Sequence, residues 1–153
     1  MTHLKQSGGC ECQKSRFAID AQPLARAFCH CTICQQFNDA PYSDVVVVKG
    51  SGVTMDDAHK VEFKSYASPP IVKRGKCSEC GKPAIEFLRI PPFPQYAIIP
   101  SAAFSDTTAL PDPQIHIFYD RRVADINDPL PKHSGYFPSQ LAFMACLIRG
   151  SFA

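Results

Sequence analysis

Residues 29–34 read Cys-His-Cys-Thr-Ile-Cys, which places three cysteines within six residues. Two thiolates that are one or two residues apart can reach one metal ion from a single turn, whereas a disulfide between such close neighbours is strained. Two smaller groups repeat this pattern, Cys10-Glu11-Cys12 and Cys77-Ser78-Glu79-Cys80. Seven of the eight cysteines therefore lie in groups that favour metal binding, and zinc is the expected metal.

The number of grouped cysteines predicts two different zinc sites. A closed structural site takes four protein ligands, so seven cysteines cannot complete two of them. The two pairs are expected to form a closed site that ties the N-terminal segment to the middle of the chain: Cys10, Cys12, Cys77 and Cys80. The other three are expected to hold a second zinc ion whose fourth position is open, as in catalytic sites: Cys29, Cys31 and Cys34.

Several alternatives to this division stay open. One of His30, His116 or His133 could occupy the fourth position of the second site and make it purely structural. Cysteine pairs could also form disulfides, and cysteine-only ligation suits an iron–sulfur cluster as well. Because the first thirty residues contain no apolar segment typical of a secretory signal, we expect a cytoplasmic, reducing location, where metal-bound thiolates are favoured over disulfides.

The ligand set of the open site favours thiol chemistry. Three thiolates and a divalent zinc ion sum to a net charge of about −1, so this centre is a weaker Lewis acid than zinc held by three histidines. We therefore expect this centre to activate water poorly. A soft centre of this kind accepts another thiol and keeps it as a nucleophilic thiolate, which suits attack on an electrophilic carbon.

Length and composition restrict the other possible functions. The 153 residues are 45% hydrophobic and 20% charged, which fits a single domain over residues 1–153 with one core. The formal net charge of +2 comes from scattered charges, so the sequence predicts no nucleic-acid partner. No segment approaches the roughly 20 apolar residues of a membrane span, and the sequence indicates no particular oligomeric state.

The sequence predicts a mainly β fold. The 14 prolines leave few windows for a helix, since proline in a helix interior costs about 3 kcal/mol. The run Val45-Val46-Val47-Val48 predicts a strand that is buried on both faces, and residues 61–66 alternate as in a half-buried strand. Further short strands are expected over residues 17–21, 84–90, 96–99 and 115–119.

One helix is predicted at about residues 139–150. Ser139 is its expected N-cap, and Gly150 is the expected residue just beyond its end. Four apolar side chains at near-helical spacing are expected to cover a sheet: Leu141, Met144, Leu147 and Ile148. Cys146 falls within this helix and is expected to be a buried core thiol.

Several short segments, taken in chain order, form a further pattern: Gly8-Gly9-Cys10-Glu11-Cys12, Cys29-His30-Cys31-Thr32-Ile33-Cys34, Ser65 to Ser68, Arg74-Gly75-Lys76-Cys77-Ser78-Glu79-Cys80-Gly81, His116-Ile117 and Asp128-Pro129-Leu130-Pro131. This pattern resembles the glutathione-dependent formaldehyde-activating enzyme family, which includes the centromere protein V domains. The order and spacing agree from about residue 8 to about residue 138.

The resemblance implies a fold of antiparallel sheets around the zinc site, often called a β-tent. It also implies structural zinc on the four paired cysteines, and chemistry near the zinc held by the other three. The activity attributed to the family's namesake is condensation of formaldehyde with glutathione to S-hydroxymethylglutathione, a carbon–sulfur lyase reaction in the reverse sense. The expected partners are therefore a small-molecule thiol and a small aldehyde.

A few residues outside the cysteine groups are candidates for handling protons or substrate. His116 lies in an apolar run and is a candidate proton donor, if it faces the open zinc. His30 lies between two ligands, so its side chain is expected to point away from the metal, in a supporting or surface position. Four basic residues are candidates to bind the carboxylates of a peptide-like thiol: Arg74 and Arg121, with Lys73 and Arg122 beside them.

The preferred function is a zinc-dependent carbon–sulfur lyase-type enzyme that joins or cleaves a glutathione-like thiol and a small aldehyde such as formaldehyde. Its candidate catalytic residues are Cys29, Cys31, Cys34 and His116. The alternative is a non-catalytic zinc-binding interaction module with the same fold, since fold does not fix function. A third reading is a thiol–disulfide or sulfoxide reductase that uses one cysteine directly.

Overall fold

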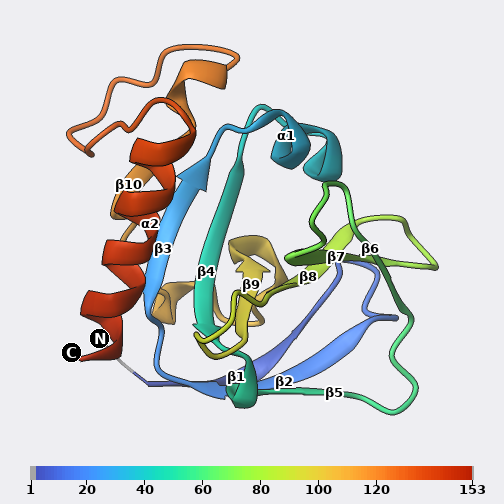
Figure 1. The fold of residues 1–153 in the computed structure, drawn as a ribbon. Coiled ribbons are helices and arrows are strands. Elements are labelled where there is room, and N and C mark those ends of the chain that lie inside the picture. The colour runs from blue at the N-terminus through green and yellow to red at the C-terminus, as the bar shows by residue number, and fades with distance from the viewer. Residues whose placement is uncertain (1–2, 153) are drawn as a thin grey trace.

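Two β-sheets and two helices make up the fold of this computed structural model, which describes residues 3–152 (Figure 1). The smaller sheet has three antiparallel strands in the order β1-β2-β5: β1 (Leu4–Gly9), β2 (Arg16–Ala21) and β5 (Val53–Met55). The larger sheet has the order β10-β3-β4-β9-β8-β7-β6: β10 (Ile115–Ile117), β3 (Ala25–Cys29), β4 (Ser43–Lys49), β9 (Tyr96–Pro100), β8 (Pro83–Leu88), β7 (Val72–Cys77) and β6 (Val61–Lys64).

The mainly β prediction is confirmed, and the predicted strands are present with slightly different ends. One pair of strands departs from the expected antiparallel arrangement, because β10 runs parallel to β3. The chain between β9 and β10 covers residues 101–114 and contains two short 3-10 helices, Ser101–Ala103 and Thr107–Ala109. A connection of this length allows the chain to re-enter the sheet in the parallel direction.

Strand β4 is buried on both faces, as its run of valines predicts. Val46 and Val48 pack into a hydrophobic cluster with Phe17 of the smaller sheet, whereas Val47 faces a second cluster on the opposite side. Because successive side chains of a strand point to opposite faces, a strand between two cores needs an uninterrupted apolar sequence. The two cores meet at this strand.

The C-terminal helix α2 (Tyr136–Ser151) lies beside β3 and β10 (Figure 1). It is predicted correctly as an element, but its start and its buried face differ from the prediction. Gly135 is the N-cap, while the Ser139 hydroxyl accepts a hydrogen bond from Phe118 N–H and donates one to the carbonyl of His133. The helix buries Phe143, Cys146 and Leu147, and of the four side chains expected to cover the sheet Leu141 and Ile148 are exposed.

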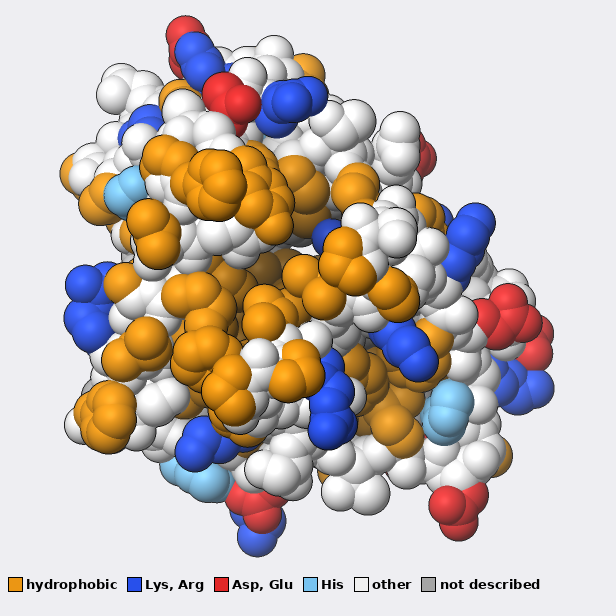
Figure 2. Space-filling model, in the orientation of Figure 1, with side chains coloured by type: hydrophobic (Ala, Val, Ile, Leu, Met, Phe, Trp, Pro, Cys, Tyr) orange, Lys and Arg blue, Asp and Glu red, His pale blue; other side chains and the backbone are white. Residues whose placement is uncertain are grey.

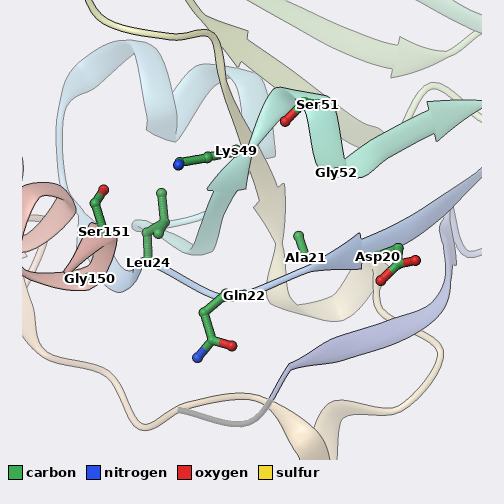
Figure 3. A pocket seen from close by; sticks show the side chains of 9 residues that line it. All are labelled: Asp20, Ala21, Gln22, Leu24, Lys49, Ser51, Gly52, Gly150 and Ser151. Atoms are coloured by element: carbon green, nitrogen blue, oxygen red, sulfur yellow. The ribbon is translucent and has the colours of Figure 1, made fainter. Parts of the chain in front are cut away.

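Gly150 lies inside α2 rather than beyond it, and its role is close packing. A β-carbon on Gly150 would lie 2.1 Å from the carbonyl oxygen of Leu24. The junction borders a surface pocket of about 580 Å³, where Figure 3 shows Gly150 next to Leu24. The segment before β3 therefore crosses the helix where no side chain intervenes.

Gly150→Val is expected to destabilise the protein by about 2–4 kcal/mol, because the new side chain forces the end of α2 away from Leu24. Urea unfolding measures the change. Ala145→Val is the matched control, since Ala145 is an exposed position of the same helix and should cost only a few tenths of a kcal/mol. Equal losses in the two variants would contradict the packing role.

A second helix, α1 (Thr32–Asn38), was not expected from the sequence. It begins inside the cysteine group of residues 29–34, with Cys31 as its N-cap, and buries Cys34 and Phe37. Two further 3-10 helices complete the fold, Gly50–Gly52 and Tyr119–Arg121. In the part of the chain that the structure describes, no helix is long and apolar enough to cross a membrane.

Candidate metal centres

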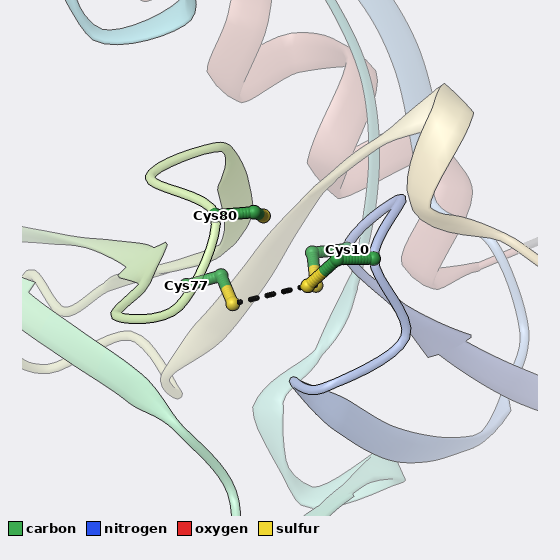
Figure 4. A group of neighbouring side chains, drawn as sticks. Cys10, Cys77 and Cys80 are labelled. Carbon is green, nitrogen blue, oxygen red and sulfur yellow. Dashed lines mark hydrogen bonds between the residues drawn. The ribbon is translucent and has the colours of Figure 1, made fainter.

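The four paired cysteines come together although the two pairs are far apart in sequence. Cys10 directly follows β1, Cys12 lies in the next turn, Cys77 ends β7, and Cys80 lies in the turn before β8. Their four sulfur atoms all lie within 4.8 Å of one another. Figure 4 shows the two turns facing each other with their sulfur atoms between them.

The spacing of these sulfur atoms fits a tetrahedral zinc ion. The Sγ atoms of Cys10 and Cys12 are 3.1 Å apart, and those of Cys12 and Cys77 are 3.6 Å apart. Four sulfurs at the usual Zn–S distance of about 2.3 Å would be separated by about 3.8 Å. Because four thiolates complete the coordination of structural zinc, this donor set suits a closed site.

Backbone hydrogen bonds hold both turns. Cys10 N–H donates to the carbonyl of Ser15, and Cys77 N–H donates to the carbonyl of Lys82. Gln13 and Gly81 have φ angles of 62° and 74°, in the left-handed region that lets a chain reverse tightly. Each turn thus contributes two thiols to the same group of four sulfur atoms.

The three cysteines of residues 29–34 form a second group at the junction of β3 and α1. Cys29 ends β3, Cys31 is the N-cap of α1, and Cys34 lies in its first turn. The Sγ atoms of Cys29 and Cys34 are 3.3 Å apart, and Cys34 N–H donates to Cys31 Sγ over 3.2 Å. Among the described residues, no histidine or carboxylate atom joins these three sulfurs as a fourth ligand.

The start of α1 favours a thiolate on Cys31. Hydrogen bonds from the thiols of Cys29 and Cys34 lower the pKa of Cys31 to about 3, although burial opposes this. Hydrogen bonding to Cys31 is the main reason why the pKa of Cys29 is raised well above its usual value. The partial positive charge at a helix N-terminus also stabilises a thiolate. Cys31 is therefore the most acidic thiol of the three.

Arg74 lies next to this group, although 40 residues separate it from Cys34. Its Nη1 is 3.7 Å from Cys34 Sγ and also donates to the carboxylate of Glu86. Only 13% of the Arg74 side chain and 3% of the Glu86 side chain are exposed. Burial raises the pKa of Glu86, and the Arg74 charge opposes part of that shift. The sequence reasoning identified Arg74 and missed Glu86.

A cavity of about 370 Å³ opens beside the three cysteines. All three line it, together with Arg74 and Glu86. Its other walls come from both helices, from strands of the larger sheet and from the segment between β6 and β7. Figure 2 shows hydrophobic side chains gathered around a hollow on this face of the molecule. None of the paired cysteines lines this cavity, although Cys10 borders a separate surface pocket of about 330 Å³. The group of three is the one whose sulfurs all meet a single space suitable for a small molecule.

His116 does not lie in this cavity. Along the parallel pair of β10 and β3, Ile117 is opposite Cys29 and His116 is opposite Phe28, so His116 and Cys29 point to different faces of the sheet. The buried His116 contacts the Phe28 ring, with the ring centroids 5.0 Å apart. Its position gives no support to the expectation that it donates a proton at the cysteines.

His116 instead belongs to a buried chain of hydrogen bonds. Its Nδ1 lies 2.9 Å from Nε2 of His30, and its Nε2 lies 2.7 Å from the carboxylate of Asp128. Burial lowers the pKa of His30 to about 4, so His30 is neutral at pH 7. His30 is outside the ligand group, as expected, but it is buried and not on the surface. This chain links the peptide between two candidate ligands to the loop after β10.

Asp128→Asn is expected to lower stability at neutral pH and to remove part of the acid sensitivity. Hydrogen bonds from Lys132 and then from His116 lower the pKa of Asp128 from 3.8 to about 2. Its stabilising effect is therefore complete above about pH 4 and is lost as the pH falls toward 2. Urea unfolding of both proteins should show a stability difference that shrinks across this range. A difference independent of pH would contradict the prediction.

The other expected basic residues lie outside the cavity. Arg121 has 64% of its side chain exposed and pairs with Asp120 over 3.5 Å. Arg122 pairs with Asp125, and Lys73 is exposed on β7. Arg74 is therefore the one basic candidate that the structure brings to the three cysteines. Cys146 is buried in α2, as predicted.

The match to known proteins agrees with this geometry. No curated protein matches the chain. Among solved structures, the chain is similar to a crystal structure of a protein from Rhodobacter sphaeroides, with 14% identity and a TM-score of 0.52 over 65% of this chain and 87% of that one. This likeness concerns the fold alone. A family model described as glutathione-dependent formaldehyde-activating enzyme matches residues 5–121, which is more than half of the sequence, and the chain belongs to that family.

Proposed function

We propose that the protein is a zinc-dependent carbon–sulfur lyase-type enzyme that joins or cleaves a thiol and a small aldehyde such as formaldehyde. The observation that carries this proposal is the group of three cysteine sulfurs that lines a cavity without a fourth ligand among the described residues. Two zinc ions per chain are part of the proposal: one closed by the four paired cysteines, and one held by Cys29, Cys31 and Cys34.

The chemistry follows from the donor set. Zinc bound by three thiolates supplies a soft position at which a substrate thiol is deprotonated and stays nucleophilic. In the joining direction, the substrate sulfur forms a bond to the aldehyde carbon, the electron pair of the C=O bond moves to oxygen, and that oxygen takes a proton. The proton that the thiol has lost balances the one that the oxygen gains.

The chain's own residues contribute placement and charge. The junction of β3 and α1 brings the three sulfurs together, and Cys31 is both a candidate ligand and the helix cap. Arg74 is held at the cavity by Glu86, and its remaining N–H groups are candidates to donate to the aldehyde oxygen as negative charge develops there. We propose that His116 acts on the site only through His30, as a positioning residue.

Cobalt substitution tests the thiol site directly, because sulfur bound to cobalt gives charge-transfer absorption. Adding a thiol to the cobalt protein should change this absorption, and adding formaldehyde should then form adduct faster than in buffer, measured by NMR. Cys146→Ser is the control, since this cysteine is buried away from the cavity and should leave both signals intact. No spectral change with any thiol would overturn the proposal.

A partner-binding zinc module is the second candidate. The observation in its favour is the exposure of three large apolar side chains near the start of α2: Tyr136, Phe137 and Leu141, which are 58%, 75% and 72% exposed. Exposed apolar clusters often mark interaction surfaces. An interaction module needs no catalytic turnover, whereas the enzyme does. A variant that loses the zinc ion of the three-cysteine site therefore distinguishes the two candidate functions, because only the enzyme would lose activity.

A further inference from the structure

The walls of the cavity beside the three cysteines are mostly apolar. Ile33 of α1, Leu88 of β8, Ile98 of β9, Ile117 of β10 and Phe143 of α2 all line it. Five separate elements thus present branched or aromatic side chains to the same space. A cavity of this kind gains affinity by removing apolar surface of its ligand from water.

The cavity has little capacity to bind a charged ligand. Within the described chain, its lining includes two residues with full side-chain charges, Arg74 and Glu86, besides the cysteines. Most of both side chains is buried and they pair with each other, so neither is left free to pair with a charged ligand. Its other polar side chains are neutral, including Ser43, Ser68 and Gln140. A carboxylate or ammonium group that entered would lose its water without gaining an oppositely charged partner.

The cysteines make this preference stronger. Three thiolates with a divalent zinc ion would carry about −1 charge, and the one cation of the described lining, Arg74, is already paired with Glu86. The potential at the open position is therefore not positive. A peptide thiol with two carboxylates and one amine, such as glutathione, would leave its charged groups without free partners in the described lining. Of the basic residues expected from the sequence, Arg74 lines the cavity but is paired with Glu86, and Arg121, Lys73 and Arg122 lie elsewhere.

We infer that the thiol substrate of this protein has an uncharged, apolar body, and is not a charged peptide thiol. The inference rests on the proposed function, because it names the substrate class of the same site. Its sulfur lies at the three cysteines, and its hydrocarbon part fills the cavity between α1, β8 and α2. Arg74 with its carboxylate partner is the feature that sets this preference.

Two thiols of similar length separate the possibilities: 1-butanethiol, which is uncharged, and 3-mercaptopropionate, which ends in a carboxylate. Titration of the cobalt-substituted protein should give at least about tenfold tighter binding of butanethiol, and glutathione should bind more weakly still. Equal or tighter binding of mercaptopropionate or glutathione overturns the inference and leaves the proposed function intact. Absence of any response to all three thiols overturns both.

Glu86→Gln tests the source of the preference, because it removes the carboxylate that pairs with Arg74. The variant should bind mercaptopropionate more tightly, and the preference for butanethiol should fall by about tenfold. Glu62→Gln on β6 is the matched control, since Glu62 is exposed and outside the cavity. This variant should keep the same preference for butanethiol over mercaptopropionate as the unchanged protein. An unchanged preference in a folded Glu86→Gln protein overturns the assignment.

A second variant keeps the test valid if Glu86→Gln does not fold. Ile71 is only half-buried and lines the cavity, so Ile71→Lys adds a cation to its wall with less disturbance of the core. This variant should bind butanethiol about tenfold more weakly and gain affinity for mercaptopropionate. Undiminished butanethiol binding would mean that the thiol does not occupy this cavity, which overturns the inference.

Discussion

Replacing Cys77 with serine is expected to reduce the zinc content from two ions per chain to one and to remove most of the stability of the fold. Cys77 is buried, ends β7, and lies at the point where the N-terminal turn meets the turn before β8. Structural zinc in small domains contributes about 10–16 kcal/mol of binding free energy, which is comparable with the roughly 5–15 kcal/mol stability of a whole domain. Metal analysis by mass spectrometry and urea unfolding measure the two effects.

The chain contains a matched control for this experiment. Cys146 is as buried as Cys77, with 1% exposed in each case, but it lies in α2 away from both cysteine groups. Cys146→Ser should keep two zinc ions and lose only about 1–3 kcal/mol, the cost of a buried hydroxyl that replaces a thiol. Retention of both zinc ions in Cys77→Ser, or equal losses of stability in the two variants, would contradict the closed site.

The same two cysteine groups could be recognised from the sequence because their spacing is local. Cys10 and Cys12, or Cys29 and Cys31, are close together in any fold. Counting the four ligands that a closed zinc site needs was then enough to assign the two cysteine pairs to one site. The buried strand β4 is similar, since a run of four valines encodes burial on both faces without reference to distant residues.

The features that were missed depend on long-range contacts. His30 meets His116 only because β10 pairs with β3 in the parallel direction, and no local pattern encodes that pairing. Arg74 reaches Cys34, and Glu86 reaches Arg74, through the pairing of β7 with β8. The sequence predicts a strand at Glu86 but none at Arg74. Such contacts could not be placed before the sheet topology was known.

The helix errors have a different origin, which is capping. Helix α1 has only seven residues, and a cysteine thiol accepts the hydrogen bond that serine, threonine or aspartate usually accepts at an N-cap. In α2 the reverse occurs, because Ser139 resembles a cap in the sequence while its hydroxyl serves Phe118 and His133. The usual N-cap residue types were therefore absent at the start of α1, and in α2 a serine of the usual type was not the cap.

Cys31→Ser is expected to remove the zinc ion of the open site while leaving the fold nearly intact. Serine is a strong N-cap, so its hydroxyl can accept the Cys34 N–H in place of the thiol and α1 should still form. Cys31 is also less buried than Cys29 and Cys34. The zinc content should therefore fall from two ions per chain to one, while the free energy of unfolding changes by no more than about 2 kcal/mol.

The effect of Cys31→Ser on activity separates the two candidate functions. If the protein is a carbon–sulfur lyase-type enzyme, adduct formation from thiol and formaldehyde should fall by about a hundredfold or more, toward the rate in buffer, because the position that activates the thiol is lost. Thr32→Ser, one residue further along α1 and not a candidate ligand, is the control and should keep both zinc ions and the full rate. A Cys31→Ser protein that has lost one zinc ion but retains the rate of the unchanged protein would exclude catalysis at this site and favour the interaction module.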